Sequence, residues 1–444
     1  MTASTALPVP LPLPSLSSAQ LQRQPLVQAQ PVDHAYDALA ARYLAPWAAN
    51  GVTLQQVDAS HHHWGAYRDP GLGGYVPEHV DGNPNCRVQL LAQRIFYVPC
   101  VGPRSKKRLA RQFAMLELIR AVLDRHSLPD LDLAIALVDR PTVPKAAVTA
   151  GASPPLVFGY ATTPDHFTVP FPYVNFAPNS SWRRLFDAQA ASEWPPMIQR
   201  QARGVWRGRC YSVCDGDAGT SACVRRNPQW LHRRQLVTAA AGCPSLVDAA
   251  LVKRNGLSCK GLARTDRLSM AGHAQFAYLV HVDGNGFSGR LDELLALGGV
   301  VLKQDSPYNA FYYPLLRAHE HYVPLASDLA DLCATVAALR EDKDTSLRLA
   351  AAAANFTASA LSPVAVQGYV AALLRRYAAL QRFTPKRHAR AVEWAGRGTA
   401  ARSEGSVTLT CARAWRGGAP VAQCADQLIA STVTSGVEDP RDSG

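Results

Sequence analysis

The residues with the clearest chemical pattern lie at 283–290, where the sequence reads DGNGFSGR. Three glycines, Gly284, Gly286 and Gly289, let the backbone bend sharply and bring N–H groups close to a ligand. Arg290 adds a planar guanidinium, which can bond two phosphate oxygens at once. This spacing predicts a phosphate-binding loop or an ordinary glycine turn, and by itself it leaves both open.

The same glycines fit the G-x-G-x-x-G spacing of dinucleotide-binding loops. Asp305 stands about 20 residues further on, where a ribose-binding acid is found in that motif. No Gly-Lys-Ser/Thr follows the glycines, so the segment is not a P-loop. A nicotinamide-dependent dehydrogenase is therefore one alternative that this pattern permits.

The elements around the loop must place it at the edge of a sheet. Residues 276–282 form a short run rich in aromatic and β-branched residues, which predicts a buried strand. Apolar residues at helical spacing predict a helix over 290–297, with Ser288 as its N-cap, and Val300 begins another strand. A strand, glycine loop and helix in this order would bring a phosphate to the helix N-terminus.

A second candidate is Asp139, which stands where a nearly all-apolar strand over 131–138 ends, two residues before Pro141. Ligands of open α/β sheets bind at the carboxyl ends of the strands, so this carboxylate is a catalytic candidate by position. The alternative is a loop aspartate that caps a turn or pairs with Arg140.

Further elements are expected along the chain. They are helices over 35–49, 104–126 and 229–238, strands over 94–98 and 154–160, an element of unclear type over 246–255, and C-terminal helices capped by Asp328, Asp344 and Ser362. A dense group of cysteines suggests one or two local disulfides, with free buried thiols as the alternative. Its members are Cys210, Cys214, Cys223, Cys243 and Cys259.

The glycine segment, followed by VVLK at 300–303, HYVPL at 321–325 and DLAD at 328–331, resembles glycosyltransferase family 90. This family includes the Rumi-type protein O-glucosyltransferases, capsule-associated proteins and lipopolysaccharide-modifying transferases. The segments at 128–145 and 204–208 also match its motifs, and the resemblance covers about residues 90–382.

The resemblance implies an α/β fold of the GT-B type, with two Rossmann-like domains and the donor site in the cleft between them. The domains implied are an acceptor-side domain that carries the base (35–200), a nucleotide-sugar-binding domain (201–360) and a C-terminal helix that returns to the first domain (361–383). Composition outside the resemblance predicts a disordered leader (1–34) and a low-complexity extension (384–444).

The resemblance also implies roles for single residues. Asp139 matches the catalytic base, although its neighbours differ from the family's usual Arg-Asp-Tyr-Pro. The implied donor-binding residues are Arg207, Gly208, Arg226, Gly284, Asn285, Gly286, Phe287, Ser288, Gly289 and Arg290, and the implied acceptor contacts are Phe171, Tyr173 and Phe176, for which core packing is the competing interpretation.

The reaction implied is inverting transfer of glucose, or of xylose, from a UDP-sugar to a hydroxyl of a protein serine or a glycan. The partners are then the UDP-sugar and that acceptor, with neither a metal nor another cofactor, and the oligomeric state stays open. The family usually works in the secretory lumen, so the resemblance implies the lumen of the endoplasmic reticulum or Golgi. The N-terminal segment, with its alternating prolines, does not have the pattern of a signal peptide.

Composition bounds the alternatives. The chain has 444 residues and a net charge of +12, which suggests an anionic partner. A basic nucleic-acid-binding protein would need a basic face with interleaved aromatics, and the arginines here are scattered. The sequence contains no run of about 18 apolar residues, so it predicts no transmembrane helix. A catalytically inactive sugar- or peptide-binding protein of the same fold is the remaining alternative.

Overall fold

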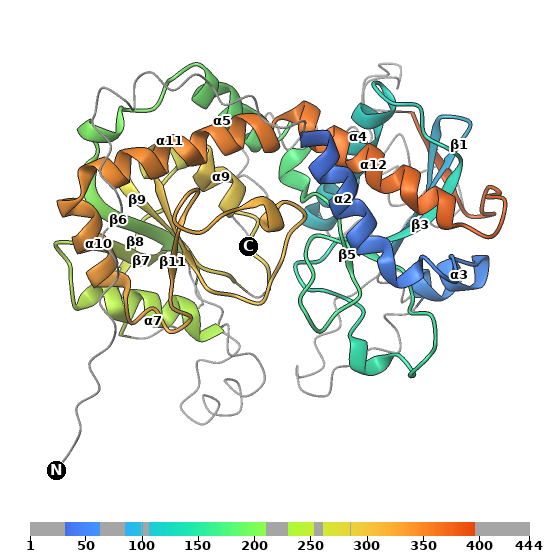
Figure 1. The fold of residues 1–444 in the computed structure, drawn as a ribbon, viewed down its shortest axis with the longest axis horizontal. Coiled ribbons are helices and arrows are strands. Elements are labelled where there is room, and N and C mark those ends of the chain that lie inside the picture. Colours follow the sequence, from blue (N-terminus) through green and yellow to red (C-terminus); the bar gives the residue numbers. More distant parts are fainter. Residues whose placement is uncertain are drawn as a thin grey trace, which may run out of the picture. The chain divides into compact units, whose positions relative to one another are not determined.

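Two six-stranded sheets, each flanked by helices, make up the described part of the chain (Figure 1). The structure is a computed structural model, and it describes residues 32–62, 85–98, 100, 106–209, 230–252, 261–284 and 286–395. The two sheets give the α/β fold of the GT-B type that the sequence predicts. We call them the first and the second sheet in the order in which the chain enters them.

The first sheet has the strand order β12-β2-β1-β3-β4-β5. Its strands are β1 (Asn85–Leu91), β2 (Arg94–Val98), β3 (Leu131–Ala136), β4 (Phe158–Gly159), β5 (Val169–Pro170) and β12 (Val392–Trp394). Strand β1 is antiparallel to both β2 and β3, whereas β3, β4 and β5 are parallel. The sheet is therefore mixed, and only its β3–β5 part follows the parallel pattern expected of a Rossmann-like domain.

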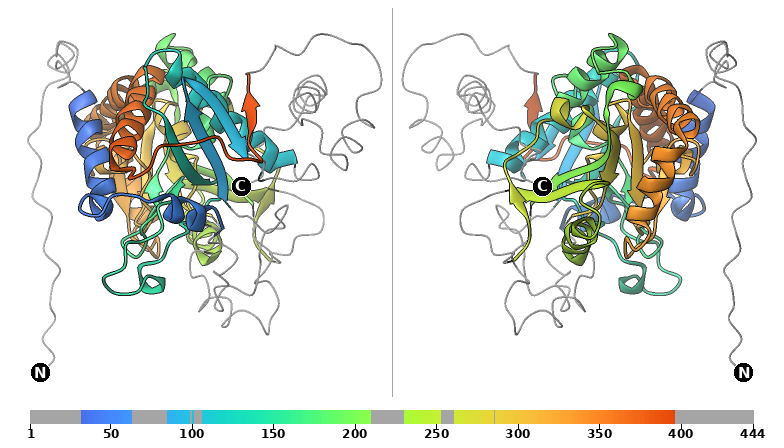
Figure 2. Two further views of the ribbon diagram at one scale, coloured as in Figure 1. Left: turned by 90° about the vertical axis from the view of Figure 1, so that its right-hand side faces the viewer. Right: turned by 90° about the vertical axis from the view of Figure 1, so that its left-hand side faces the viewer.

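Strand β12 corrects one expectation. The segment 384–444 was expected to be a low-complexity extension, but Val392–Trp394 pairs with β2 as the edge strand of the first sheet (Figure 2). The Trp394 ring stacks on Phe113 at a centroid distance of 5.1 Å, which buries this strand against helix α4 (Lys106–Leu123). An aromatic residue was the available signal in the sequence, because a buried tryptophan anchors an otherwise short strand.

The second sheet is parallel throughout, with the strand order β11-β10-β9-β6-β7-β8. Its strands are β6 (Gln201–Gly208), β7 (Val247–Val252), β8 (Arg264–Thr265), β9 (Phe276–His281), β10 (Val300–Gln304) and β11 (Val323–Leu325). The strands expected over 276–282 and from Val300 are confirmed, and the unclear element over 246–255 contains β7. The chain builds outward from β6 to β8 on one side and from β9 to β11 on the other. The topological switch point thus lies between β6 and β9, whose carboxyl ends border the crevice where such sheets bind ligands.

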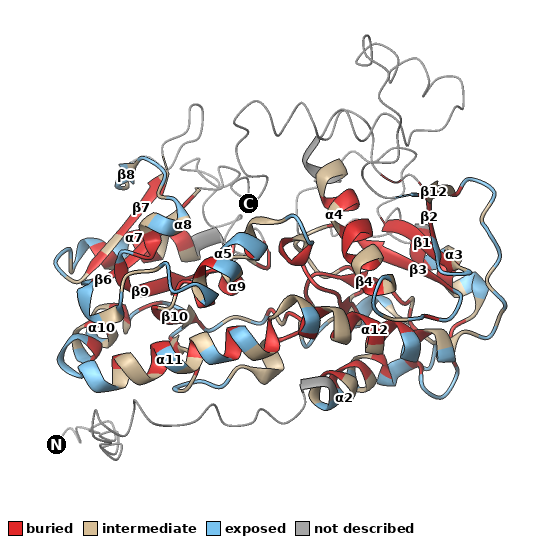
Figure 3. Ribbon diagram, turned by 90° about the horizontal axis from the view of Figure 1, so that it is seen from above, coloured by how far each residue is buried: buried red, intermediate tan, exposed pale blue. Residues whose placement is uncertain are grey.

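Helices cover both sheets (Figure 3). They are α2 (Val32–Leu44), α3 (Leu54–His62), α4, α5 (Ser181–Ala190), α7 (Trp230–Ala241), α8 (Met270–His273), α9 (Leu291–Leu295), α10 (Leu332–Glu341), α11 (Lys343–Ala360) and α12 (Pro363–Leu380). Helices α7 and α10 pack their apolar residues on one face of the second sheet, and α9 lies on its other face. Helix α12 contacts α2, α4 and β3 beside the first sheet.

The C-terminal helices begin at different residues from those expected. Ser362 caps α12 as predicted, since its hydroxyl accepts a hydrogen bond from the Ala365 N–H. The predictions for Asp344 and Asp328 are wrong. Asp342 caps α11 by accepting from the Thr345 N–H at 2.9 Å, and α10 begins after Asp331.

Hydrogen bonds from α12 tie the C-terminal helix to the first sheet. The Tyr369 hydroxyl donates to the Pro170 carbonyl at 2.7 Å, and the Tyr377 hydroxyl donates to the Asp132 carbonyl at 2.5 Å.

Of the helices in the described ranges, no single one has the length and apolar character to cross a membrane. The bent pair α11 and α12 meets that test only when the two are taken together, by length and composition.

Two disulfides lie in the described residues, Cys86–Cys100 and Cys243–Cys333. The partner of Cys243 is thus 90 residues away on α10, and not within the cysteine cluster as expected. The other four members of that cluster lie outside the described residues.

Candidate active site

The glycine loop, residues 283–290, leaves the carboxyl end of β9 at the switch point of the second sheet. Asp283 organises it: the Ser288 N–H donates to one carboxylate oxygen at 3.0 Å, and the Ser306 hydroxyl donates to the other. Burial raises the pKa of Asp283, and the Ser306 hydrogen bond opposes that shift. Inside the loop the Gly284 N–H donates to the Gly286 carbonyl at 3.1 Å. The loop is thus held by its own first residue.

The helix after the loop is shorter than expected. Helix α9 has five residues, and Arg290 stands at its N-cap position without a side-chain capping bond. Ser288 is therefore not the N-cap, because the N-cap position falls two residues later, at Arg290. Gly298, with φ of 67°, follows the helix as expected for a glycine stop. So short a helix adds little dipole, and charged side chains must supply most of the attraction for an anion.

Cations gather at this edge of the second sheet. Arg290 donates from Nη1 to the Arg207 carbonyl, which brings the glycine loop against the end of β6. Arg207 itself is turned toward β7: Nη2 donates to the Asp248 carboxylate at 2.8 Å and Nη1 to the Asp248 carbonyl at 2.8 Å. Its side chain is 11% exposed. The expected donor contact of Arg207 stays a prediction.

Two more cations complete the group, and the sequence analysis missed both as site residues. Arg233 on α7 donates from Nε to the Asp283 carbonyl at 3.2 Å and lies over the Trp206 ring. Lys303 on β10 lies 5.2 Å from the ring centre of Tyr313. Burial lowers the pKa of Lys303, against the attraction of Asp283.

Two buried histidines show how positive this edge is. Burial, followed by the charges of Lys303, Arg290 and Arg233, lowers the pKa of His281 well below its ordinary value. Burial and the charge of Arg290 lower the pKa of His273 to about 4. Both rings are neutral at neutral pH, and the fixed cations around them favour an anionic ligand.

Asp139 lies beyond the carboxyl end of β3, in the first sheet, as predicted. Arg111 of α4 donates from Nη2 to its Oδ1 at 2.8 Å and to the Tyr173 hydroxyl oxygen at 3.1 Å. The Arg111 side chain is 9% exposed and that of Asp139 is 27% exposed. Buried Arg111 therefore orients the carboxylate, which stays partly exposed to solvent.

Asp139 and the glycine loop are in direct contact. The Phe287 N–H donates to the Asp139 carbonyl at 2.9 Å. A Cβ atom on Gly286 would lie 2.5 Å from that same oxygen, so only glycine permits this approach. The carboxyl ends of β3 and β9, which belong to different sheets, therefore meet at one point.

The expected acceptor residues are mostly core residues. Phe171 is 1% exposed and packs on Phe158, and Phe176 is 7% exposed and packs on Trp182 and Phe311. Their burial corrects the expectation that these two rings face an acceptor. Tyr173 differs, because its hydroxyl reaches Arg111.

Some expected site residues cannot be placed. Arg226 and Asn285 lie outside the described residues. Gly208 ends β6, where the Trp206 ring would collide with any Cβ. Arg111 was missed although it stands four residues before Met115 and seven before Leu118, on the apolar face of its helix. A charge on such a face signals a buried ion pair.

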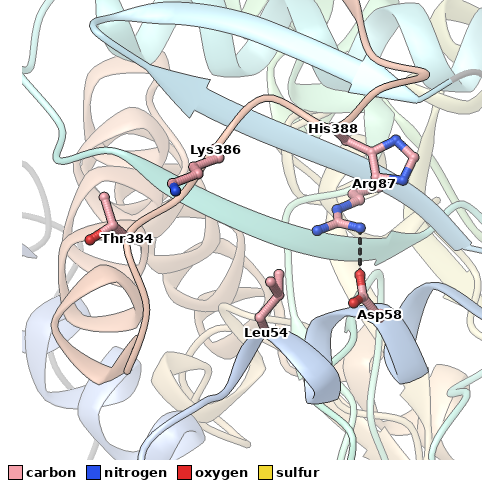
Figure 4. Close-up of a pocket in the computed structure, with 6 residues that line it drawn as sticks. All are labelled: Leu54, Asp58, Arg87, Thr384, Lys386 and His388. Atoms are coloured by element: carbon pink, nitrogen blue, oxygen red, sulfur yellow. Dashed lines mark hydrogen bonds and ion pairs between the residues drawn. The ribbon is translucent and has the colours of Figure 1, made fainter.

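A cavity of about 840 Å³ lies elsewhere (Figure 4). It is lined by Leu54, Asp58, Arg87, Thr384, Lys386 and His388. Arg87 pairs there with Asp58 at 2.6 Å and with Asp132 at 2.7 Å. None of these residues belongs to the site described above. Asp132 is used in this buried ion pair.

The site therefore consists of a glycine loop and cations at the switch point of a parallel sheet, next to a carboxylate of a second sheet, within a fold of the GT-B type. A model of the family described as Glycosyl transferase family 90 matches residues 61–412. The chain belongs to this family, and the match extends beyond the expected range of 90–382 at both ends.

The chain is also similar to characterised O-glucosyltransferases, at low sequence identity. Protein O-glucosyltransferase 2 of Danio rerio is 25% identical over 299 residues, which cover 65% of this chain and 55% of that protein. The O-glucosyltransferase rumi of Drosophila melanogaster is 23% identical over 290 residues, which cover 64% and 62%. The chain spans less than two thirds of the length of each. The structure of HepE from Anabaena in complex with UDP and glucose has a TM-score of 0.28 against this chain. The two are 14% identical, and the match covers 42% of this chain and 51% of HepE.

Proposed function

We propose that this protein is an inverting glycosyltransferase that moves glucose from UDP-glucose to a hydroxyl group of a protein or a glycan. One observation carries the proposal: the Phe287 N–H of the glycine loop bonds the main chain of Asp139. A carboxylate and a cationic loop from two sheets are thereby held side by side. Family membership and the similarity to O-glucosyltransferases support the choice of glucosyl transfer.

The donor diphosphate would bind at the second sheet. Main-chain N–H groups of the glycine loop and the guanidinium of Arg290 would hold it, with Arg233 and Lys303 raising the local positive potential. These fixed cations would stabilise the charge that develops on departing UDP. In this proposal they take the part that a divalent metal has in other transferases, so the reaction needs no added metal.

Asp139 would act as the general base. Its carboxylate takes the proton of the acceptor hydroxyl while the hydroxyl oxygen forms a bond to the anomeric carbon of the sugar. The bond from that carbon to the β-phosphate oxygen breaks, and UDP leaves with the electron pair. Attack from the face opposite UDP inverts the anomeric configuration. Arg111 would hold the carboxylate turned toward the acceptor.

We place the protein in the lumen of the secretory pathway. The disulfides Cys86–Cys100 and Cys243–Cys333 suit an oxidising compartment. Protection of the expressed protein from protease in intact microsomes tests this placement, and digestion without detergent would contradict it.

The function is tested by UDP release from the purified full chain, with UDP-glucose and with UDP-xylose, in EDTA. We expect slow, metal-independent hydrolysis of UDP-glucose, because water can replace the acceptor at an open base. Faster release from UDP-xylose would mean that the donor is UDP-xylose, and the proposed reaction type would stand. No release from either donor, together with no thermal shift on adding UDP, would leave a sugar- or peptide-binding protein of the same fold.

A further inference from the structure

We propose that Arg111 and Tyr173 form a positioning device that fixes the carboxylate of Asp139 and links its orientation to the glycine loop. The inference rests on the proposed function, since it names residues that act through the proposed base. Neither residue is a catalytic residue, because both lie behind Asp139 and are buried.

Arg111 is bound in three directions. Its Nη2 donates to Asp139 at 2.8 Å and to the Tyr173 hydroxyl oxygen at 3.1 Å, and its Nη1 donates to the Leu137 carbonyl at 3.1 Å. Two of these bonds hold the segment that leaves β3, one through its main chain and one through the carboxylate. A rigid, planar fork held this way fixes the direction of the carboxylate as well as its charge.

The surroundings of Arg111 keep it charged. Its guanidinium carbon lies 5.6 Å from the ring centre of Tyr173 and 5.8 Å from that of Tyr160, so two aromatic faces flank it. Burial lowers the pKa of Arg111, but Asp139 together with Tyr173 and Tyr160 holds the pKa above its usual value. Arg111 therefore supplies a permanent positive charge behind Asp139.

Tyr173 connects this pair to the glycine loop. A Cβ atom on Gly289 would lie 2.5 Å from the Tyr173 ring, so the ring and the loop backbone are in close contact. The ring also packs edge-on against Phe287 at 5.9 Å between centroids. Phe287 in turn bonds the Asp139 carbonyl. The contacts close a circuit from Asp139 through Arg111, Tyr173 and Phe287 back to Asp139.

This circuit has a consequence for catalysis. A displacement of the glycine loop moves Tyr173 and Phe287, and both bear on the position of Asp139. The loop that would hold the donor diphosphate thus also sets the base that activates the acceptor. Misplacement of a catalytic group by about 1 Å can cost roughly a hundredfold in rate.

Three substitutions test the device. Arg111→Lys keeps the charge and removes the fork, Tyr173→Phe removes only the hydroxyl, and Gly286→Ala pushes against the Asp139 carbonyl. We expect kcat to fall about tenfold to a hundredfold for Arg111→Lys and about threefold for Tyr173→Phe, while KM for UDP-glucose and the Kd of UDP stay within about twofold. Gly286→Ala should lower kcat about tenfold, because its methyl group displaces the main chain of the base.

A matched control separates positioning from folding. Arg200 is also a buried arginine, and it donates to the Pro195 carbonyl at 2.9 Å and to the Leu297 carbonyl at 2.8 Å. Arg200→Lys should lower the Tm and leave kcat unchanged. The Arg111→Lys change should cost no further activity in the Asp139→Asn background, because Arg111 acts through that carboxylate. An equal additional loss in that background would overturn the inference and leave the proposed function standing.

A second measurement does not depend on activity. Hydrogen exchange of the segment 286–289 should be several times faster in Arg111→Lys and in Tyr173→Phe than in the unmodified protein, because the Phe287 N–H loses a fixed partner. If the unmodified protein transfers no sugar, the proposed function fails, and faster exchange in these variants still supports the positioning device. Unchanged exchange in both variants would overturn the device whether or not the protein is active.

Discussion

The carboxyl edges of the two sheets carry opposite kinds of charge and hold them in opposite ways. At the first sheet a single carboxylate, Asp139, is partly exposed and is paired with one buried arginine. At the second sheet several cations surround a short loop, and the carboxylate there, Asp283, is buried and used to fold that loop. The first edge thus presents a basic oxygen, and the second presents positive charge. The difference suits a reaction in which one side takes a proton and the other side receives a leaving anion.

The backbones differ in the same sense. The second sheet is fully parallel and has a switch point, which creates an opening outside β6 and β9. The first sheet is mixed, and its β1–β2 hairpin and β12 edge contribute no such opening. The first sheet acts as a support for one loop, and the second sheet builds a binding surface.

The comparison is tested most strongly by Asp139→Asn. Loss of a general base should reduce sugar transfer by about 10²–10⁴-fold, while the affinity for UDP stays unchanged. Asp187→Asn is the matched control, because Asp187 also pairs with an arginine at 2.8 Å but on the surface of α5. Transfer rates and isothermal titration with UDP measure the two effects. If the Asp139→Asn variant transfers sugar at the rate of the unmodified protein, Asp139 is not the general base.

The next effect concerns the positive edge itself and is seen as stability against pH. His273 has a folded-state pKa of about 4, lowered by burial and then by Arg290, against 6.5 for the unperturbed group. Below pH 6.5 the unfolded chain binds a proton that the folded chain does not, so the free energy of unfolding falls as the pH drops. The loss reaches about 3 kcal/mol near pH 4.

Urea unfolding at several pH values checks this loss. His273→Gln should flatten the slope between pH 6.5 and about 4, because the titrating ring is gone. His319→Gln is the control, since His319 lies exposed in the β10–β11 connection. Equal slopes in the two variants would show that burial and the charge of Arg290 do not keep a proton off His273.

The smallest effect separates charge from geometry at the second edge. Arg290→Lys keeps the positive charge and loses the planar fork, so the affinity for UDP should fall about tenfold. Arg317→Lys serves as the control, because Arg317 is 69% exposed and pairs with Glu320 in solvent. Titration with UDP gives both values. An unchanged affinity in Arg290→Lys would mean that potential alone, and not a bidentate contact, holds the diphosphate.

Local patterns were enough to predict much of the fold. The strand, glycine loop and helix around Gly286 were predicted because β-branched runs, glycines and apolar spacing act over a few residues. The position of Asp139 at a strand end followed from an apolar run that stops at Pro141. The first residue of a helix was harder to predict from the sequence. Several aspartates near α11 could cap it, and only Asp342 accepts a hydrogen bond from a main-chain N–H of its first turn.

Contacts between distant segments could not be predicted in the same way. Arg111 lies 28 residues before Asp139 and 62 before Tyr173, and nothing in the sequence pairs them. The edge strand β12 and the Cys243–Cys333 disulfide join segments far apart in the chain. The burial of Phe171 and Phe176 likewise depends on which elements fold over them, not on the loop that carries them.

By itself the sequence determined the family, the parallel second sheet, the glycine loop and the aspartate at the end of β3. These features depend on residue type and short spacing, which are local quantities. Only the tertiary structure decided that the loop touches Asp139, that Arg207 is turned toward Asp248, and that Arg111 holds the Asp139 carboxylate. The reason is physical. A buried charge must find its partner in three dimensions, and chain separation does not limit which residue that partner is.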